Sequence, residues 1–261
     1  HIPRRLSRIR QRCPHAMQRT ALSGNRSYNS PGAVSAPRVL SREDMPVGED
    51  YITRSKELPE VYNHGMLSIA IQAGGRSSRM GHDKALISLA GRPLIEHVLE
   101  RIEGLADDLL ITTNHPESLR YLGLRLVSDA EPGAGALQGL RTALAHAQGS
   151  DLLVIACDMP FMPRPLLEHI IARRGLADIV VPRRGMHFEP LLALYRRESC
   201  LPAVEAALAR GEQRMVSFYA GLDILAIEGG ELAQLDPDGQ AFFNINTPQD
   251  LARAEALLAR A

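Results

Sequence analysis

The chain has 261 residues, enough for one α/β domain of ordinary size plus an appendage, and its 30 Lys and Arg residues balance its 30 Asp and Glu residues. No apolar stretch approaches the length of a membrane span, so we expect a soluble protein without a membrane partner. Its three cysteines, Cys13, Cys157 and Cys200, are far apart and lack the paired spacing of a zinc site. This cysteine usage suits a reducing compartment and predicts a cytoplasmic protein.

The first 65 residues differ from the rest of the chain. Residues 1–42 contain nine Arg and no Asp or Glu, and the segment is rich in Ser, Pro, Gly and Asn. Such a segment cannot bury enough surface to offset its ordering entropy, so we expect residues 1–65 to be a disordered basic extension and residues 66–261 to form one domain.

Three interpretations of this extension compete. It is a transit-like peptide, a basic arm that touches nucleic acid, or translated upstream sequence before a true start at Met66. We favour the last, because Met66 directly precedes the first predicted strand and the sequence opens on His1. An arginine-rich run with few aromatic residues and no folded reader is weak evidence for nucleic-acid binding, so we expect no nucleic-acid partner.

A buried strand followed by a phosphate-sized loop is predicted at residues 66–84. The apolar run has the length of a central parallel strand that is covered on both faces. Gly74 and Gly75 end it, and two adjacent residues without Cβ let backbone N–H groups approach an anion closely. Three cations follow that can hold a triphosphate: Arg76, Arg79 and Lys84. The alternative is an ordinary strand-to-helix turn with solvated arginines.

Neither of two common phosphate motifs fits this loop. A P-loop ends in Gly-Lys-Ser/Thr, whereas Gly81 is followed by His82 and Asp83. The dinucleotide fingerprint Gly-x-Gly-x-x-Gly is broken at Arg76.

Helices and strands alternate through the next part of the chain. The pattern predicts a helix opened by Gly91, Arg92 and Pro93, a strand at 109–113 ending at Asn114, and a strand at 124–128 ending at Asp129. A helix at 137–147 and a strand at 152–156 that runs into Asp158 follow.

The second half is less regular. Helices are predicted at 163–174, 199–210 and 213–220, and strands at 179–182, 190–195, 223–227 and 241–245. Thr247 and Pro248 form a good start for a last helix, as N-cap and first helical residue.

This alternation implies right-handed crossovers and a Rossmann-like three-layer α/β/α fold with a mainly parallel sheet. Polar residues that end successive strands then gather at one edge, where ligands bind in open α/β sheets. Four residues are predicted to reach it: Gln72, Asn114, Asp129 and Asp158.

Asp158 directly follows the most apolar strand. A lone carboxylate at a strand end is often a helix cap or turn former. Opposite a cationic glycine loop, it becomes a candidate ligand for Mg²⁺, which takes one or two carboxylates together with phosphate oxygens. We favour the metal interpretation because of this context.

Asn114 and Asp129 also have two interpretations. They can be turn residues that bond their own backbone. Alternatively, a carboxylate can accept from a guanine N1–H and amino group, and an amide can pair with base edges or sugar hydroxyls.

Residues 73–84, Ala-Gly-Gly-Arg-Ser-Ser-Arg-Met-Gly-His-Asp-Lys, resemble the signature loop of nucleotidyltransferases that activate small molecules, and most closely that of the molybdenum cofactor guanylyltransferases. The family pattern begins Leu-Ala-Gly-Gly, and this chain has Gln72 in the first place. Cys-Asp-x-Pro at 157–160 resembles the family's metal-binding turn, and Asn-x-Asn-Thr-Pro at 244–248 its pterin-side segment. The resemblance covers residues 66–261 and implies a fold of the nucleotide-diphospho-sugar transferase type.

The resemblance also implies roles for individual residues. Catalysis and nucleotide binding would use the loop and the strand ends, with Asp158 as the ligand of Mg²⁺, and Arg214, Asn244 and Asn246 would face the pterin. The implied catalytic residues are Arg79, Lys84 and Asp158. The implied nucleotide-binding residues are Gln72, Ala73, Gly74, Gly75, Lys84, Asn114, Asp129 and Asp158. A Gly-Ala-Leu-Gln-Gly run at 135–139 resembles a family loop near the nucleotide.

The activity implied is transfer of GMP from GTP to the phosphate of molybdenum-bearing molybdopterin, with molybdoenzyme-maturation proteins as further partners. Two alternatives stay open. One is a related cytidylyltransferase or another small-molecule nucleotidyltransferase, since base choice depends on few contacts. The other is a non-catalytic nucleotide-binding protein that delivers cofactor to an apoenzyme.

Overall fold

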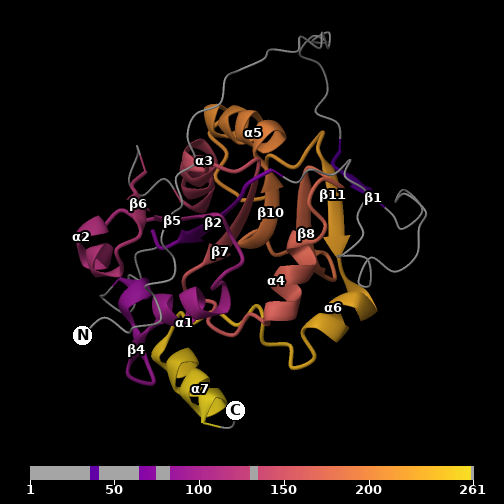
Figure 1. The fold of residues 1–261 in the computed structure, drawn as a ribbon. Coiled ribbons are helices and arrows are strands. Elements are labelled where there is room, and N and C mark those ends of the chain that lie inside the picture. The colour runs from indigo at the N-terminus through magenta and orange to yellow at the C-terminus, as the bar shows by residue number, and fades with distance from the viewer. Residues whose placement is uncertain (1–35, 41–64, 75–82, 130–134, 260–261) are drawn as a thin grey trace.

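A nine-stranded sheet forms the centre of the computed structural model, which describes residues 36–40, 65–74, 83–129 and 135–259 (Figure 1). Its order is β1-β11-β8-β10-β7-β2-β5-β6, with β9 added beside β8. Gly75, Arg76 and Arg79, which we assigned to the phosphate loop, lie outside the described residues, as does Cys13.

The strands of this sheet are short, and most lie where the apolar runs predicted them. They are β1 (Arg38–Leu40), β2 (Leu67–Gln72), β5 (Asp108–Thr112), β6 (Arg125–Val127), β7 (Asp151–Ala156), β8 (Ile179–Arg184), β9 (His187–Phe188), β10 (Leu192–Arg196) and β11 (Asp223–Ile227). A separate hairpin is made of β3 (Ser88–Leu89) and β4 (Arg92–Pro93).

Helices connect these strands. They are α1 (Leu94–Arg101), α2 (Pro116–Leu119), α3 (Ala136–His146), α4 (Arg164–Ile171), α5 (Arg197–Ala209), α6 (Gly229–Leu235) and α7 (Pro248–Leu258), with short 3-10 turns at Lys84–Leu86 and Arg120–Leu122. Within the described ranges, none of these helices is long and apolar enough to cross a membrane.

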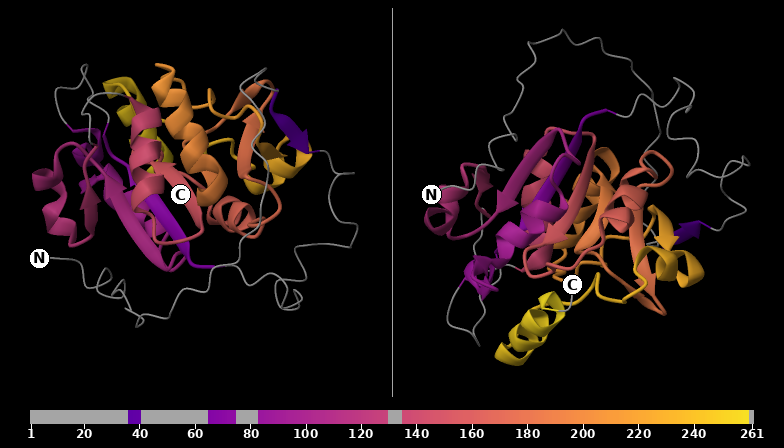
Figure 2. Two further views of the ribbon diagram at one scale, coloured as in Figure 1. Left: turned by 90° about the horizontal axis from the view of Figure 1, so that it is seen from above. Right: turned by 60° about the horizontal axis from the view of Figure 1, so that its bottom comes forward.

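The central strands are buried on both faces because their side chains alternate between two apolar layers. Ile69 and Ile71 of β2 pack into the cluster that holds α1 and α4, whereas Ala70 packs into the cluster that holds α3 and α5. Figure 2 shows helices on both sides of the sheet. The predicted three-layer α/β/α fold with a mainly parallel sheet is therefore confirmed.

Strand direction decides where the functional residues meet. β2 pairs in parallel with both β5 and β7, and β5 pairs in parallel with β6, so these four strands end at the same edge. β10 is antiparallel to β7 and β8 and is the exception in the middle of the sheet.

The opposite edge is held together by a buried carboxylate. Asp108, at the start of β5, accepts hydrogen bonds from Ser68 Oγ at 2.7 Å, from Arg125 at 2.7 Å to both oxygens, and from the backbone N–H of Gln148 at 3.1 Å. Gly149 completes this packing, because a Cβ there would lie 2.2 Å from the carbonyl oxygen of Met66. The network ties the starts of β2, β5 and β7 together.

Two predicted elements are wrong. Residues 213–220 form turns and no helix, since the Arg214 carbonyl accepts from both the N–H and the hydroxyl of Ser217, and Phe218 and Tyr219 are buried against each other edge to face. Residues 241–245 form no strand, because the buried Asp236 carboxylate accepts the N–H of Ala241 and draws the chain into a turn.

Residues 38–40 lie within the predicted N-terminal extension and are among the residues that the structure describes. This segment forms β1, which pairs in parallel with β11 at the sheet edge, with Arg38 3.8 Å from the Asp223 carboxylate. An edge strand offers free backbone N–H and C=O groups, so even a short segment with little apolar surface can pair there.

We predict that Asp108→Ala lowers the free energy of unfolding by about 3 kcal/mol, because Arg125 loses the partner of its partly buried charge. Urea denaturation followed by circular dichroism measures the change. Glu117→Ala removes the partner of an exposed ion pair with Arg120 and serves as the control, with an expected change below about 0.5 kcal/mol. Equal effects of the two substitutions would show that the network does not stabilise the sheet.

Candidate active site

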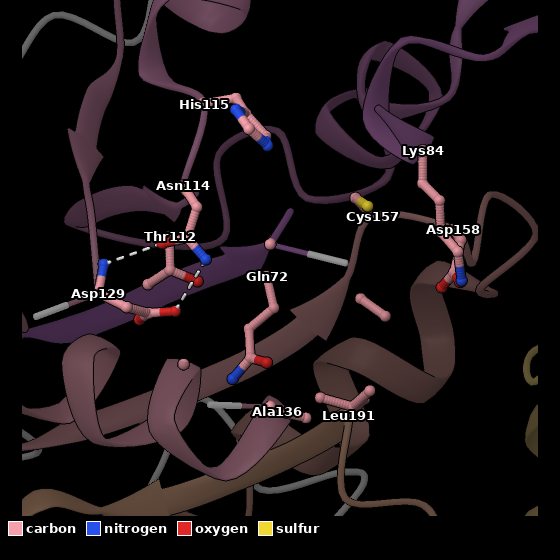
Figure 3. A pocket seen from close by; sticks show the side chains of 14 residues that line it. Gln72, Lys84, Thr112, Asn114, His115, Asp129, Ala136, Cys157, Asp158 and Leu191 are labelled. Atoms are coloured by element: carbon pink, nitrogen blue, oxygen red, sulfur yellow. Dashed lines mark hydrogen bonds and ion pairs between the residues drawn. The ribbon is translucent and has the colours of Figure 1, made fainter. Parts of the chain in front are cut away.

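A cavity of about 660 Å³ opens at the carboxyl edge of β2, β5, β6 and β7 (Figure 3). It brings together the four polar residues predicted to reach this edge. Its walls are made by Gln72, Gly74, Lys84, Thr112, Asn114, His115, Asp129, Gly135, Ala136, Gly139, Ala156, Cys157, Asp158 and Leu191.

Lys84 and Asp158 face each other across one end of this cavity. The ammonium of Lys84 lies 3.2 Å from Asp158 Oδ2, and both side chains are largely buried. Lys84 is held there because Asp83 caps its 3-10 turn, accepting the N–H of Ala85. The short turn thus directs the Lys84 ammonium toward Asp158, two residues after the end of β7.

The C-terminal segment completes this end of the site. Asn246 Oδ1 accepts a second hydrogen bond from the Lys84 ammonium at 2.5 Å, and the N–H of Ile245 donates to the carbonyl oxygen of Asp158 at 3.1 Å. The segment is fixed by the capping box of α7, in which Asp250 accepts the N–H groups of Asn246 and Thr247. The Thr247 hydroxyl also donates to Asp250, at 2.8 Å. This bond contributes most to lowering the pKa of Asp250, and the two N–H bonds lower it further.

Asn114 and Asp129 form the other end of the cavity. Asn114 Nδ2 lies 3.4 Å from Asp129 Oδ2, and the Asp129 N–H donates to Asn114 Oδ1 at 3.3 Å. The second oxygen of Asp129, Oδ1, is buried without a partner among the described residues. An amide and a carboxylate therefore present a mixed donor and acceptor surface suited to a polar ligand.

Cys157 lines the cavity but is not equipped as a nucleophile. Burial, first of all, raises the pKa of its thiol well above the usual range, and the neighbouring Asp158 carboxylate adds to the shift. A thiol that stays protonated is a poor nucleophile and a poor metal ligand.

The donor set fits Mg²⁺ better than a transition metal. Within the described ranges, no three His, Cys, Asp or Glu side chains gather in a way that could hold a metal ion. Mg²⁺ needs no such cage, because it binds through one or two carboxylates together with phosphate oxygens and water. Asp158, at the cavity wall beside Lys84, is the residue that would hold it.

Some residues assigned from the sequence do not line the cavity. Arg214 and Asn244 are exposed and are not among its wall residues. Ala73 is buried beside it, with its N–H bonded to the carbonyl oxygen of Thr112 at 2.8 Å. Gly75 and Arg79 lie outside the described residues.

Other wall residues were missed. Thr112, His115 and Leu191 belong to the cavity, and Figure 3 shows the His115 ring projecting from the segment that carries Asn114. The position of His115 directly after a strand-ending Asn was a signal that could have identified it. Leu191 had no such signal, because it reaches the wall only through its position directly before the antiparallel strand β10.

Comparison with known proteins agrees with this geometry. Residues 69–224 match the family model of the MobA-like NTP transferase domain. A probable molybdenum cofactor guanylyltransferase from Pelotomaculum thermopropionicum is 35% identical over 187 residues, which cover 72% of this chain and 91% of the relative. A molybdenum cofactor guanylyltransferase from Desulfosudis oleivorans is 35% identical over 192 residues, covering 72% of this chain and 94% of the relative.

Solved structures show the same fold. Molybdopterin-guanine dinucleotide biosynthesis protein A from Archaeoglobus fulgidus superposes with a TM-score of 0.65 at 28% identity, covering 74% of this chain and all of that one (100%). The 2-C-methyl-D-erythritol 4-phosphate cytidylyltransferase from Thermus thermophilus superposes with a TM-score of 0.55 at 21% identity, covering 74% and 98%, and shows the fold alone. The predicted nucleotide-diphospho-sugar transferase type is thereby confirmed. Because the family model spans most of the domain and the curated relatives align over nearly their whole length, the chain belongs to the MobA-like NTP transferase family.

Proposed function

We propose that this protein transfers GMP from GTP to the terminal phosphate of molybdenum-bearing molybdopterin, forming the guanine dinucleotide cofactor and releasing pyrophosphate. The observation that carries the proposal is the Lys84–Asp158 pair, a cation and a carboxylate 3.2 Å apart at the end of a cavity that also presents amide and carboxylate groups. The names of the curated relatives support the choice of GTP and of a molybdopterin acceptor.

The chemistry needs little beyond positioning and charge neutralisation. A phosphate monoester is already anionic near neutral pH, so the attacking oxygen needs no general base. The backbone N–H groups of Gly74 and Gly75 would hold the phosphates, and Lys84 and Arg79 would offset charge on the α-phosphate and on the departing pyrophosphate. Asp158 would hold Mg²⁺, which when bound offsets charge on phosphate oxygens.

The nucleoside would bind at one end of the cavity and the acceptor at the other. Asn114 and Asp129 would bind the nucleoside, together with Gln72, which ends β2, and Ala73, which follows it. On the acceptor side, Asn246 already contacts Lys84, so a pterin phosphate bound there would lie beside the reacting phosphate. Asn244 and Arg214 would bind the same acceptor. In the cytoplasm, a molybdoenzyme-maturation protein would receive the product.

The direct test measures pyrophosphate release from GTP, CTP, ATP and UTP, each with and without molybdopterin. We expect release from GTP that depends on molybdopterin, because the acceptor phosphate is the nucleophile. Preference for CTP would identify a cytidylyltransferase instead. Nucleotide binding without any pyrophosphate release would identify a non-catalytic delivery protein.

Replacement of Asp158 by alanine is expected to lower kcat by about a thousandfold, the scale of losing one electrostatic group at the reacting phosphates. Turnover is measured as pyrophosphate release with Mg²⁺ present. Asp238→Ala, which removes an exposed carboxylate outside the cavity walls, is the control and should leave kcat unchanged. Near-normal turnover by the Asp158 variant would refute its metal role.

Lys84→Met retains much of the stem and removes the charge. We expect kcat to fall about a hundredfold, with affinity for the pterin substrate changed less than threefold, because the ammonium acts mainly on charge that develops during transfer. Arg120→Met, at an exposed cation, is the control. Equal losses in kcat and in pterin affinity would assign Lys84 to binding alone.

A further inference from the structure

Two of the six buried side-chain atoms that lack a hydrogen-bond partner among the described residues belong to walls of the same cavity. One is the acceptor Asp129 Oδ1, and the other is the donor Gln72 Nε2. Buried amides are normally paired, so an unpaired one inside a ligand cavity needs an explanation. The chemistry proposed above uses Gln72 only through its place at the end of β2 and leaves its side chain unassigned.

The Gln72 side chain is confined where it lies. Figure 3 shows it extending from the end of β2 toward Ala136 and Leu191. Helix α3 packs closely against it, since a Cβ at Gly139 would lie 3.1 Å from Gln72 Oε1 and 3.5 Å from Nε2. Rotation about the last side-chain bond exchanges Oε1 and Nε2, so either end of the amide can face the cavity while the stem stays in place.

The place of Gln72 along the cavity indicates which part of a nucleotide it meets. Figure 3 shows Lys84 and Asp158 at one end, Asn114 and Asp129 at the other, and Gln72 between them. With the phosphates at Lys84 and Asp158, the Gln72 amide lies beside the nucleoside. An NH₂ group there calls for an acceptor oxygen, which the nucleoside offers as a sugar hydroxyl or a base carbonyl.

We propose that the side-chain amide of Gln72 is a specificity-determining group that donates a hydrogen bond to an acceptor oxygen of the bound nucleoside. This inference rests on the nucleotide-binding role proposed above. A buried amide donor that has no partner among the described residues is destabilising until a ligand binds, and an apolar side chain of the same size would avoid that cost. The amide therefore lowers the stability of the protein when no nucleotide is bound and provides a hydrogen bond when one is.

The test compares Gln72→Leu and Gln72→Met with the unsubstituted protein in full-length form. Affinity is measured by calorimetric titration with α,β-methylene-GTP and Mg²⁺, without molybdopterin, and thermal unfolding is measured without ligand. Both variants are expected to bind five- to tenfold more weakly, on the order of one hydrogen bond, while their Tm equals or exceeds that of the unsubstituted protein.

Thr142→Val is the matched control. Thr142 Oγ1 is also buried and unpaired among the described residues, but Thr142 is not a wall residue of the cavity. Its replacement should likewise leave Tm equal or higher, with affinity for the nucleotide analogue within twofold of the original. Loss of affinity in this control equal to that of the Gln72 variants would overturn the proposal, because the effect would then not be local to the cavity.

Two further results would also overturn it. Affinity within twofold of the original in both Gln72 variants would mean that the amide takes no part in recognition. A Tm several degrees lower in both would mean that the amide has a partner inside the protein.

A 2′-deoxy form of the analogue tests whether the acceptor is the 2′-hydroxyl. If the difference between glutamine and leucine disappears with this form, the acceptor is the 2′-hydroxyl, and if it persists, the acceptor is elsewhere on the nucleoside. Tighter binding of the CTP analogue than of the GTP analogue would contradict the proposed base choice. The same comparison of Gln72 variants, made with the CTP analogue, would then still decide the role of the amide.

Discussion

The ammonium of Lys84 joins three segments that are far apart in the sequence. It donates to Asp158, 74 residues away, and to Asn246, 162 residues away. Because both members of the ion pair are largely shielded from water, their interaction is stronger than that of an exposed pair. The contact joins the 3-10 turn at Lys84–Leu86, the segment that follows β7 and the C-terminal segment, and so brings the three together at this end of the cavity.

The polar groups at the starts of the parallel strands differ in role from those at the ends of the same strands. At the edge where β2, β5 and β7 begin, the Asp108 carboxylate is fully engaged by Ser68, Arg125 and a backbone N–H. At the edge where they end, Gln72 Nε2 and Asp129 Oδ1 are buried without partners among the described residues. Paired polar groups stabilise the sheet, and unpaired ones are available to a ligand. This arrangement is common where binding and stability compete for the same groups.

Sequence reasoning failed where tertiary packing overrides local preference. Residues 213–220 have helical spacing, yet the burial of Phe218 and Tyr219 against Tyr195 favours a chain of turns. The apolar pattern at 241–245 resembles a strand, yet Asp236 captures the backbone at Ala241, and Ile245 is buried beside α7. In both cases the hydrophobic pattern showed correctly that the side chains are buried, but not in which backbone conformation.

The sequence by itself determined the mainly parallel three-layer fold and the edge at which Gln72, Asn114, Asp129 and Asp158 gather, because apolar runs of strand length and the residues that end them are local properties. Only the tertiary structure decided which side chains touch at this edge. Asn246 bonds to Lys84, and Gln72 Nε2 lies beneath α3 without a partner among the described residues, because both outcomes depend on how helices from distant parts of the chain pack onto the sheet. Such contacts join residues whose separation in sequence carries no periodic signal, so no local pattern can specify them.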